Sequence, residues 1–344
     1  MATVGHSGPA VQGPTSLQSD RHPSDAVGMP GAPKRVLRRE IAHLARLFRG
    51  VVLYFYLPLT MLLVGLHFPY DTDASLVEPR SATPFYEAVY QPAGQGGRGL
   101  DYEQTSILAA AASNIEGQIA EFVNRYQLHD KRVLDVGSGR GYLQDIVVDY
   151  TGLDLSAKVR SHYHKPFVVG SATQMPFPDS SFDAIWTVWA IEHIPTPEKA
   201  LSEMRRVIKP GGLMFLIVAW NCTSWAADGF DVRPYSDFTP AGQLIKASTV
   251  VRGTLVFDVS YRVPTRLIRW VQYAVGGART PLRFTALRPN YEVFWQPDSD
   301  AAVSLDFVET MLWFESRGDA CLNCRGLPGD LFTYVKPLVI RVEK

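Results

Sequence analysis

The sequence lacks an excess of charge of either sign. Lysine plus arginine and aspartate plus glutamate both number 34, so the formal net charge at pH 7 is zero. A basic field is the electrostatic mark of a nucleic-acid-binding protein, and its absence argues against that class of partner. Apolar residues make up 46% of the 344 residues and charged residues 20%, which is typical of a globular protein long enough to bury a large core.

Cysteine is scarce as well. The three cysteines, Cys222, Cys321 and Cys324, imply no disulfide framework, so a reducing compartment and a cytoplasmic location are expected. Cys321 and Cys324 form one C-x-x-C pair, and a zinc site of that type normally needs a second pair. The sequence therefore predicts no metal.

The N-terminal region lacks the apolar core of a secretory signal. Residues 1–33 are rich in Gly, Pro, Ser and Ala and have no apolar period, which predicts a disordered tail. Residues 34–49 combine a helical apolar period with six lysines and arginines, which predicts a basic amphipathic helix, and residues 50–70 contain no Asp, Glu, Lys or Arg. Pro58 should kink or split that apolar stretch.

Three interpretations of residues 34–70 remain open. The segment lies on and dips into a membrane, it packs on the protein's own core, or it spans the bilayer. In a full span the basic flank would stay in the cytoplasm, which would place the rest of the chain outside. We expect the first arrangement, a membrane-associated protein on the cytoplasmic side.

Beyond a predicted linker at 71–101 the pattern is that of an α/β domain. A helix is expected over 102–127, followed by short apolar runs at 132–137, 150–155, 166–170, 182–189 and 213–220. Such runs suit strands that are buried on both faces of a parallel sheet. Their alternation with helical segments predicts a doubly wound fold.

A glycine-rich turn follows the first predicted strand. Asp135, Gly137, Ser138, Gly139 and Gly141 lie in this turn, before a predicted helix at 142–148, and Asp154 ends the next strand. Glycines permit positive φ and close approach of a ligand, and an acid at this distance can accept hydrogen bonds from ribose hydroxyls. The dinucleotide fingerprint G-x-G-x-x-G places its third glycine one position later. Asp135 would repel a pyrophosphate but attract a cation, although it could also simply cap the turn.

In these and three further motifs the chain resembles the class I S-adenosylmethionine-dependent methyltransferases, in the small-molecule and ubiquinone-pathway subgroup. The glycine motif and Asp154 are followed by Gly170-Ser171-Ala172 with Met175-Pro176-Phe177, by Ser181-Phe182-Asp183 with Glu192-His193-Ile194-Pro195, and by the turn 206–212. The resemblance implies a Rossmann-like, doubly wound, seven-stranded sheet of the class I methyltransferase type. An N-terminal apolar helical segment and an inserted cap would be added to it.

The resemblance also implies roles for individual residues. It implies that the cofactor is S-adenosyl-L-methionine and that these residues bind it: Asp135, Gly137, Ser138, Gly139, Gly141, Asp154, Leu155, Ser171, Ala172, Thr173, Val188 and Trp189. Ser171 replaces the aspartate often found there, which should weaken binding without preventing it. Trp189 could stack near the sulfonium or simply pack in the core. His193 is the candidate catalytic base, or else it only shapes the pocket.

The remaining segments complete the predicted domain. Residues 102–220 would form the methyltransferase core, and residues 302–344 its C-terminal part, with a helix at 306–314 and a last strand at 337–342. Residues 221–301 would be a substrate cap rich in aromatic residues and arginine, or a cap whose aromatics form its own core. Within it, residues 265–275 read as a helix with one apolar face that could touch a membrane.

We therefore expect a methyltransferase that acts on a small-molecule, glycan or lipid acceptor, by O-methylation through direct displacement. A non-catalytic S-adenosylmethionine-binding scaffold and a nicotinamide-linked reductase remain as alternatives.

Overall fold

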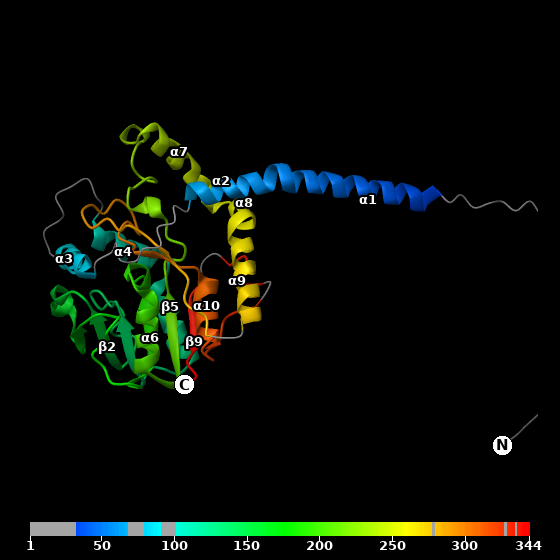
Figure 1. Cartoon of the computed structure of the whole chain (residues 1–344). Helices are drawn as coiled ribbons and strands as arrows, with labels where there is room; N and C mark the ends of the chain where they lie inside the picture. Colours follow the sequence, from blue (N-terminus) through cyan, green and yellow to red (C-terminus); the bar gives the residue numbers. More distant parts are fainter. Residues whose placement is uncertain (1–31, 68–78, 91–100, 277–278, 327–328, 334–335) are drawn as a thin grey trace, which may run out of the picture. The chain divides into compact units, whose positions relative to one another are not determined.

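The computed structural model describes residues 32–67, 79–90, 101–276, 279–326, 329–333 and 336–344 (Figure 1). It divides into two compact units, Met1–Val52 and Leu53–Lys344. The predicted tail lies outside the described residues except at its last two positions, as does most of the predicted linker.

The N-terminal segment is helical. Helix α1 covers Ala32–Val51, a π-helical turn η1 covers Val52–Tyr56, and helix α2 covers Leu57–His67, with Pro58 in its first turn. A proline cannot donate the helical hydrogen bond, which accounts for the irregular turn directly before it. Within the described part of the chain, Leu37–Leu62 is long and apolar enough to cross a membrane by length and composition, and its most apolar part is not buried.

Seven strands form one sheet in the order β3-β2-β1-β4-β5-β9-β8. The bounds are Arg132–Val136 for β1, Asp149–Asp154 for β2, Phe167–Val169 for β3, Phe182–Val188 for β4, Ile208–Ile217 for β5, Ala320–Cys321 for β8 and Leu338–Arg341 for β9. Strands β1 to β5 run parallel, and β9 is antiparallel to both β5 and β8. The seven-stranded, doubly wound α/β fold predicted from the sequence is confirmed.

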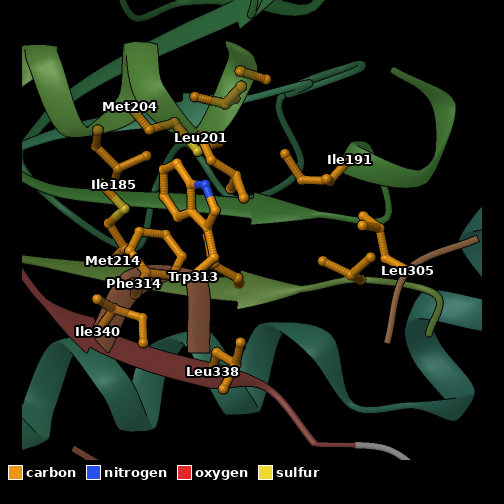
Figure 2. Close-up of a cluster of buried hydrophobic side chains, with 14 of the residues drawn as sticks. Ile185, Ile191, Leu201, Met204, Met214, Leu305, Trp313, Phe314, Leu338 and Ile340 are labelled. Atoms are coloured by element: carbon orange, nitrogen blue, oxygen red, sulfur yellow. The ribbon is translucent and has the colours of Figure 1, made fainter. Parts of the chain in front are cut away.

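Both faces of the sheet are buried, because successive side chains of a strand point to opposite faces. One face contributes Leu134, Ile185 and Met214 to a core with helices α6 (Pro197–Val207) and α10 (Phe307–Glu315) (Figure 2). In that core the fully buried Trp313 and Phe314 pack against the strands. The other face contributes Val133, Trp186 and Phe215 to a core with helix α5 (Ile115–Arg125).

The helix expected over 102–127 is divided into two. Helix α4 covers Tyr102–Ala112 and is capped by Asp101, whose carboxylate accepts a hydrogen bond from the Gln104 amide. Asn114 then takes a left-handed conformation with φ +49° before α5 begins. Asparagine tolerates that conformation better than most residues, so the break falls there. Only α5 of the two helices has buried side chains.

The helix predicted at 142–148 is not observed, and a helix lies within the predicted linker. Residues 142–148 form turns rather than a helix, because Gln144 bonds outward to the 162–164 loop: its side-chain amide donates to the His162 carbonyl (3.1 Å) and accepts from the His164 amide (3.1 Å). Within the predicted linker, Pro79–Val89 form helix α3. Its Ala82, Phe85, Tyr86 and Val89 are buried at helical spacing.

The region after β5 is largely helical. It contains η5 (Ser224–Ala226), η6 (Tyr235–Asp237), α7 (Pro240–Ser248), η7 (Thr249–Gly253), α8 (Leu255–Phe257), η8 (Asp258–Arg262) and α9 (Val263–Gly276). A short antiparallel pair, β6 (Thr285–Ala286) with β7 (Val303–Ser304), follows. Helix α10, predicted at 306–314, begins at its Asp306 cap, and Gly318 follows it with φ +86°.

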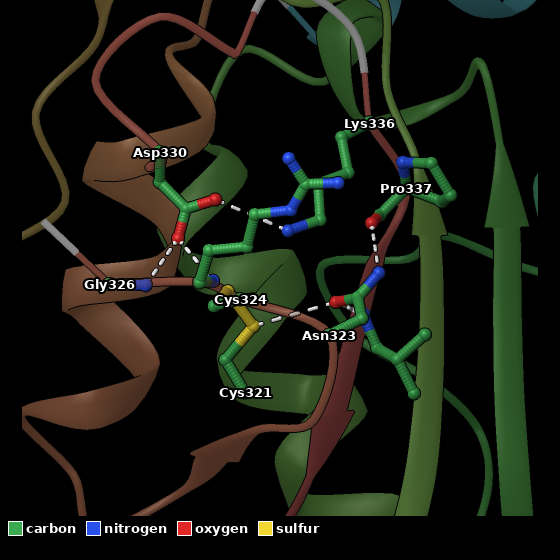
Figure 3. The surroundings of a disulfide bond; sticks show 9 residues. Cys321, Asn323, Cys324, Gly326, Asp330, Lys336 and Pro337 are labelled. Carbon is green, nitrogen blue, oxygen red and sulfur yellow. Dashed lines mark hydrogen bonds and ion pairs between the residues drawn. A yellow bond between two sulfur atoms is a disulfide. The ribbon is translucent and has the colours of Figure 1, made fainter. Parts of the chain in front are cut away.

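Cys321 and Cys324 form a disulfide, which the sequence analysis did not expect (Figure 3). The intervening turn is held by Asn323, whose side-chain oxygen accepts from the Val339 amide (3.0 Å) and whose amide donates to the Pro337 carbonyl (2.8 Å). This turn brings the two Cα atoms to 5.6 Å, within bonding reach. Cys222 is free and buried.

Candidate cofactor and acceptor site

The turn after β1 needs glycine, because a side chain does not fit at its central positions. Strand β1 ends at Val136, and Gly137 and Gly139 follow with φ of +71° and +49°. L-residues with a side chain rarely adopt this conformation. A Cβ on Gly137 would also lie 2.3 Å from Cβ of Ala190. The tight turn after β1 therefore requires glycine at 137 on two independent grounds.

The amides of this turn are used within the protein. The Gly137 and Ser138 amides both donate to the Leu153 carbonyl (2.8 and 3.1 Å), and the Gly139 amide donates to Oδ2 of Asp154 (2.9 Å). A pyrophosphate site needs free amides and the N-terminus of a helix. Here the amides are occupied, and the helix predicted at 142–148 is not formed. The turn does not fit a dinucleotide.

Asp154 is held rigidly at the end of β2. Its Oδ1 accepts from the Ser156 amide (2.9 Å), opposite the bond from Gly139 to Oδ2. Burial raises the pKa of Asp154, and these backbone bonds partly offset the rise. Each carboxylate oxygen can accept a second hydrogen bond, so the group can still receive ribose hydroxyls. Leu155 follows it, half-buried.

Asp135 is the most unusual carboxyl of the site. It is only 3% exposed, and its Oδ2 accepts from the Tyr150 hydroxyl (2.8 Å). Burial raises its pKa from 3.8 to about 7, against the effect of that hydrogen bond. A carboxylate in such surroundings is poorly solvated. It therefore attracts a cationic group brought beside it, as the sequence analysis argued.

A cavity of about 550 Å³ opens at this end of the sheet. Of the predicted cofactor residues it is lined by Asp135, Gly137, Ser138, Gly139, Val188 and Trp189. Trp189 has φ +47°, and Asp298 across the cavity has φ +64°. Residues other than glycine in this conformation cost energy and cluster at functional sites.

The other predicted cofactor residues, Asp154 and Leu155 among them, are not part of the cavity lining. Ser171, Ala172 and Thr173 follow β3, whose last residue, Val169, is paired with Asp154 in the sheet. The Ser171 hydroxyl is within 2.8 Å of the Thr173 hydroxyl and accepts from the Thr173 amide (3.2 Å). Gly141 instead faces Tyr163, whose ring would lie 2.7 Å from a Cβ at that position. The role of these residues in binding the cofactor stays a prediction.

His193 is paired with an acid that the sequence analysis missed. Its Nδ1 lies 3.3 Å from Oδ2 of Asp300 and 3.2 Å from the Asp300 carbonyl. The same Oδ2 accepts from the Tyr86 hydroxyl (2.8 Å). Burial by itself would lower the pKa of His193, but the charges of Asp300 and Glu192 outweigh it and raise the pKa. Both His193 and Asp300 line the cavity.

Aromatic side chains from three distant segments border the same cavity. Tyr90 follows α3, Tyr102 begins α4 and Phe294 comes from the inserted region, and all three line the cavity. The rings of Tyr102 and Phe294 are 4.9 Å apart, and the Tyr90 hydroxyl would lie 3.3 Å from a Cβ on Gly139. The helical spacing of the apolar residues between 82 and 89 could have predicted α3, the helix that precedes Tyr90.

The predicted cap contributes less to the cavity than expected. Of its aromatic residues only Phe294 is among the cavity-lining residues that the structure describes, together with Pro297, Asp298 and Asp300. Arg252, Arg262, Arg266 and Arg269 are buried elsewhere. The described residues contain no group of three or more His, Cys, Asp or Glu arranged to hold a metal.

One family comparison matches this part of the chain. Residues 134–216, which run from β1 into β5, match the family described as "Methyltransferase domain". Together with the strand order and the glycine turn, this shows that the chain contains a methyltransferase domain of the class I, S-adenosylmethionine-dependent type.

Individual relatives resemble the same segment. A sterol 24-C-methyltransferase from Gibberella zeae is 36% identical over 108 residues, which are 27% of this chain and 28% of that protein. A demethylmenaquinone methyltransferase from Renibacterium salmoninarum is 40% identical over 91 residues, covering 24% and 38%. A solved methyltransferase structure from Thermotoga maritima is 25% identical, with a TM-score of 0.30, covering 35% and 57%. The chain spans less than half the length of the two curated relatives.

Proposed function

We propose that the protein transfers the methyl group of S-adenosylmethionine to an oxygen atom of a small-molecule, glycan or lipid acceptor. The carrying observation is the shared cavity: it joins the glycine turn and Asp135 to His193, Asp298 and Asp300. When bound, the cofactor supplies a methyl carbon on a cationic sulfur that leaves as a neutral thioether. Quinone and sterol methyltransferases among the relatives support a small-molecule acceptor.

His193 is suited to take the proton that a hydroxyl acceptor must lose. Its Nδ1 faces Asp300, so Nε2 is the nitrogen available to an acceptor in the cavity. Asp300 fixes the ring and stabilises the imidazolium that forms, and Tyr86 holds the carboxylate of Asp300 in place. Oδ1 of Asp300 is buried and has no hydrogen-bond partner among the described residues. A polar group of the acceptor would satisfy it.

Asp135 and Asp154 are the cofactor anchors in this proposal. Asp135 would face the cationic methionine part, and Asp154 the ribose, with Trp189 beside the sulfonium. The half-buried Ser171, Ala172 and Thr173 would border the adenine. We also propose that residues 34–70 attach the protein to a membrane surface, since α1 exposes Leu37, Ile41, Leu44 and Phe48 on a helix that also carries arginines.

The test uses a methyl-labelled donor with a lipid and small-molecule extract. The proposal expects a labelled product that resists mild base as an ether does and that falls at least about tenfold with His193→Gln. His129→Gln is the matched control, because His129 is exposed and outside the cavity. A product labelled on carbon or nitrogen, or full activity of His193→Gln, would overturn the assignment of acceptor and base.

A further inference from the structure

The helical stretch at 255–276 turns arginines inward and apolar side chains outward. Elements α8, η8 and α9 follow one another without interruption over these residues. A surface helix normally turns apolar residues inward and charged residues outward. Here Arg262, Arg266 and Arg269 are 2%, 3% and 6% exposed, while the apolar side chains between them face outward.

Two of the inward arginines, Arg266 and Arg269, hold the helix to its neighbours. Arg266 forms a two-nitrogen ion pair with Asp306 (2.8–3.0 Å) and donates to the carbonyls of Leu331 and Thr333 (2.8 Å each). Arg269 pairs with Glu309 (2.6 Å). Both acids belong to α10 or its cap, beside which α9 lies (Figure 1). The arginines therefore anchor α9 to the core and are not available to bind an outside anion.

The outward face is uncharged and mostly apolar. Every exposed residue from Gly253 to Gly276 is uncharged, and the polar ones are Thr254, Thr265 and Gln272. The large apolar ones are Leu255, Val256, Val259, Leu267, Ile268, Trp270, Val271 and Val275. Leu267, Ile268, Val271 and Val275 recur at helical spacing and form one face of α9. Monomeric soluble proteins rarely expose a contiguous apolar patch of this kind unless it is an interaction site.

This face continues into the apolar N-terminal segment within the same unit. Helix α2 contacts η8, and the Tyr56 hydroxyl donates to the Val259 carbonyl. Tyr54, Phe55, Leu57, Met61 and Leu62 of that segment are also exposed. They belong to the stretch that is apolar enough to cross a membrane. The outward face of residues 255–276 adjoins this stretch, so we expect both to lie in the same environment.

We propose that the outward face of residues 255–276 lies in the interfacial region of a phospholipid bilayer, next to α2. A bilayer requires an apolar face without charges and no shape complementarity, which is what the helix offers. Trp270 suits the headgroup boundary, where indole rings gather. The inference is independent of the methyl-transfer proposal and concerns a different part of the chain from the attachment through residues 34–70.

The test labels the full-length protein with an environment-sensitive fluorophore on Val275→Cys. The label will react at this position because Cys222 is buried and Cys321 is bonded to Cys324. Phosphatidylcholine vesicles containing phosphatidylglycerol should raise and blue-shift the emission, and lipids brominated on the acyl chain should quench it. The matched control is a label on Val148→Cys, which is 60% exposed in the turn before β2 and should stay unchanged.

A second variant tests the energetics of the same face. Ile268→Glu with Val271→Glu should weaken vesicle binding on the order of tenfold or more, because charges replace two exposed apolar side chains that would enter the bilayer. Val148→Glu should have no effect. The inference is overturned if the protein sediments with vesicles while the Val275 label stays as in water, or if it does not bind vesicles. An emission change without vesicles that grows with protein concentration would instead show a contact between copies.

Discussion

Asp135 shows how a single residue can be costly for folding and useful for function. Its carboxyl is buried and its pKa lies at about 7, raised by burial. A raised folded-state pKa means that the group destabilises the protein above the pKa of the unfolded chain, with the full cost reached above about pH 8. Carboxyls with strongly raised pKa values cluster at functional sites.

Asp135→Asn should therefore stabilise the free protein and weaken the cofactor complex. At pH 8 the free energy of unfolding should rise, by at most on the order of 4 kcal/mol, since the Tyr150 hydroxyl can still donate to the amide oxygen. Urea unfolding at pH 8 and pH 5 measures this, and the gain should shrink at pH 5. Equal stability of the two proteins at pH 8, with equal cofactor affinity, would contradict it.

His193 should give the reaction rate a pH dependence. Its pKa is raised by neighbouring charges, whereas the pKa of Asp135 is raised by burial. The pKa of His193 is raised above 6.5 because the charges of Asp300 and Glu192 outweigh the effect of burial. A general base must be neutral, so the rate constant of methyl transfer should fall as the pH drops through this raised pKa. Single-turnover rates with saturating cofactor, measured from pH 5 to pH 9, test it. Asp300→Asn should move the midpoint to lower pH, and an unmoved midpoint would remove Asp300 as a positioning residue.

At the scale of elements, the sequence predicted the strands better than their connections. The runs at 132–137 and 182–189 form β1 and β4, because short, nearly continuous apolar runs suit a strand that is buried on both faces. The segment 142–148 became turns, since Gln144 bonds to a loop some 20 positions away. Hydrogen bonds between distant segments leave no local pattern, and the same is true of the pairing of His193 with Asp300.

The arginines of α9 illustrate the same limit on prediction. The sequence predicted a helix with one apolar face over residues 265–275, but no local pattern showed that its arginines point inward to α10. Arg266→Met should cost about 3–5 kcal/mol of unfolding free energy, because it leaves the Asp306 carboxylate and two carbonyls without their donor.

Arg125→Met provides the matched control for that change. It removes an exposed pair with Glu121 and should cost under about 0.5 kcal/mol. Urea unfolding of both variants compares them directly. If Arg266→Met cost no more than Arg125→Met, the pair with Asp306 would not anchor α9.

At the scale of the whole molecule, the class I methyltransferase fold was predictable because five motifs occur in order along residues 132–220. The far wall of the cavity was not, because Tyr90, Phe294 and Asp300 come from segments outside those motifs. The motifs therefore predict the side of the cavity formed by the glycine turn and not the side formed by these three residues.

Calorimetric titration of the purified protein with S-adenosylmethionine is the most direct measurement of the central claim. The fold and the site predict saturable heat at one site, a loss of affinity of at least about tenfold in Asp154→Ala, and no binding of a nicotinamide dinucleotide. Absence of heat with both S-adenosylmethionine and its demethylated product, or tighter binding of the dinucleotide, would contradict it.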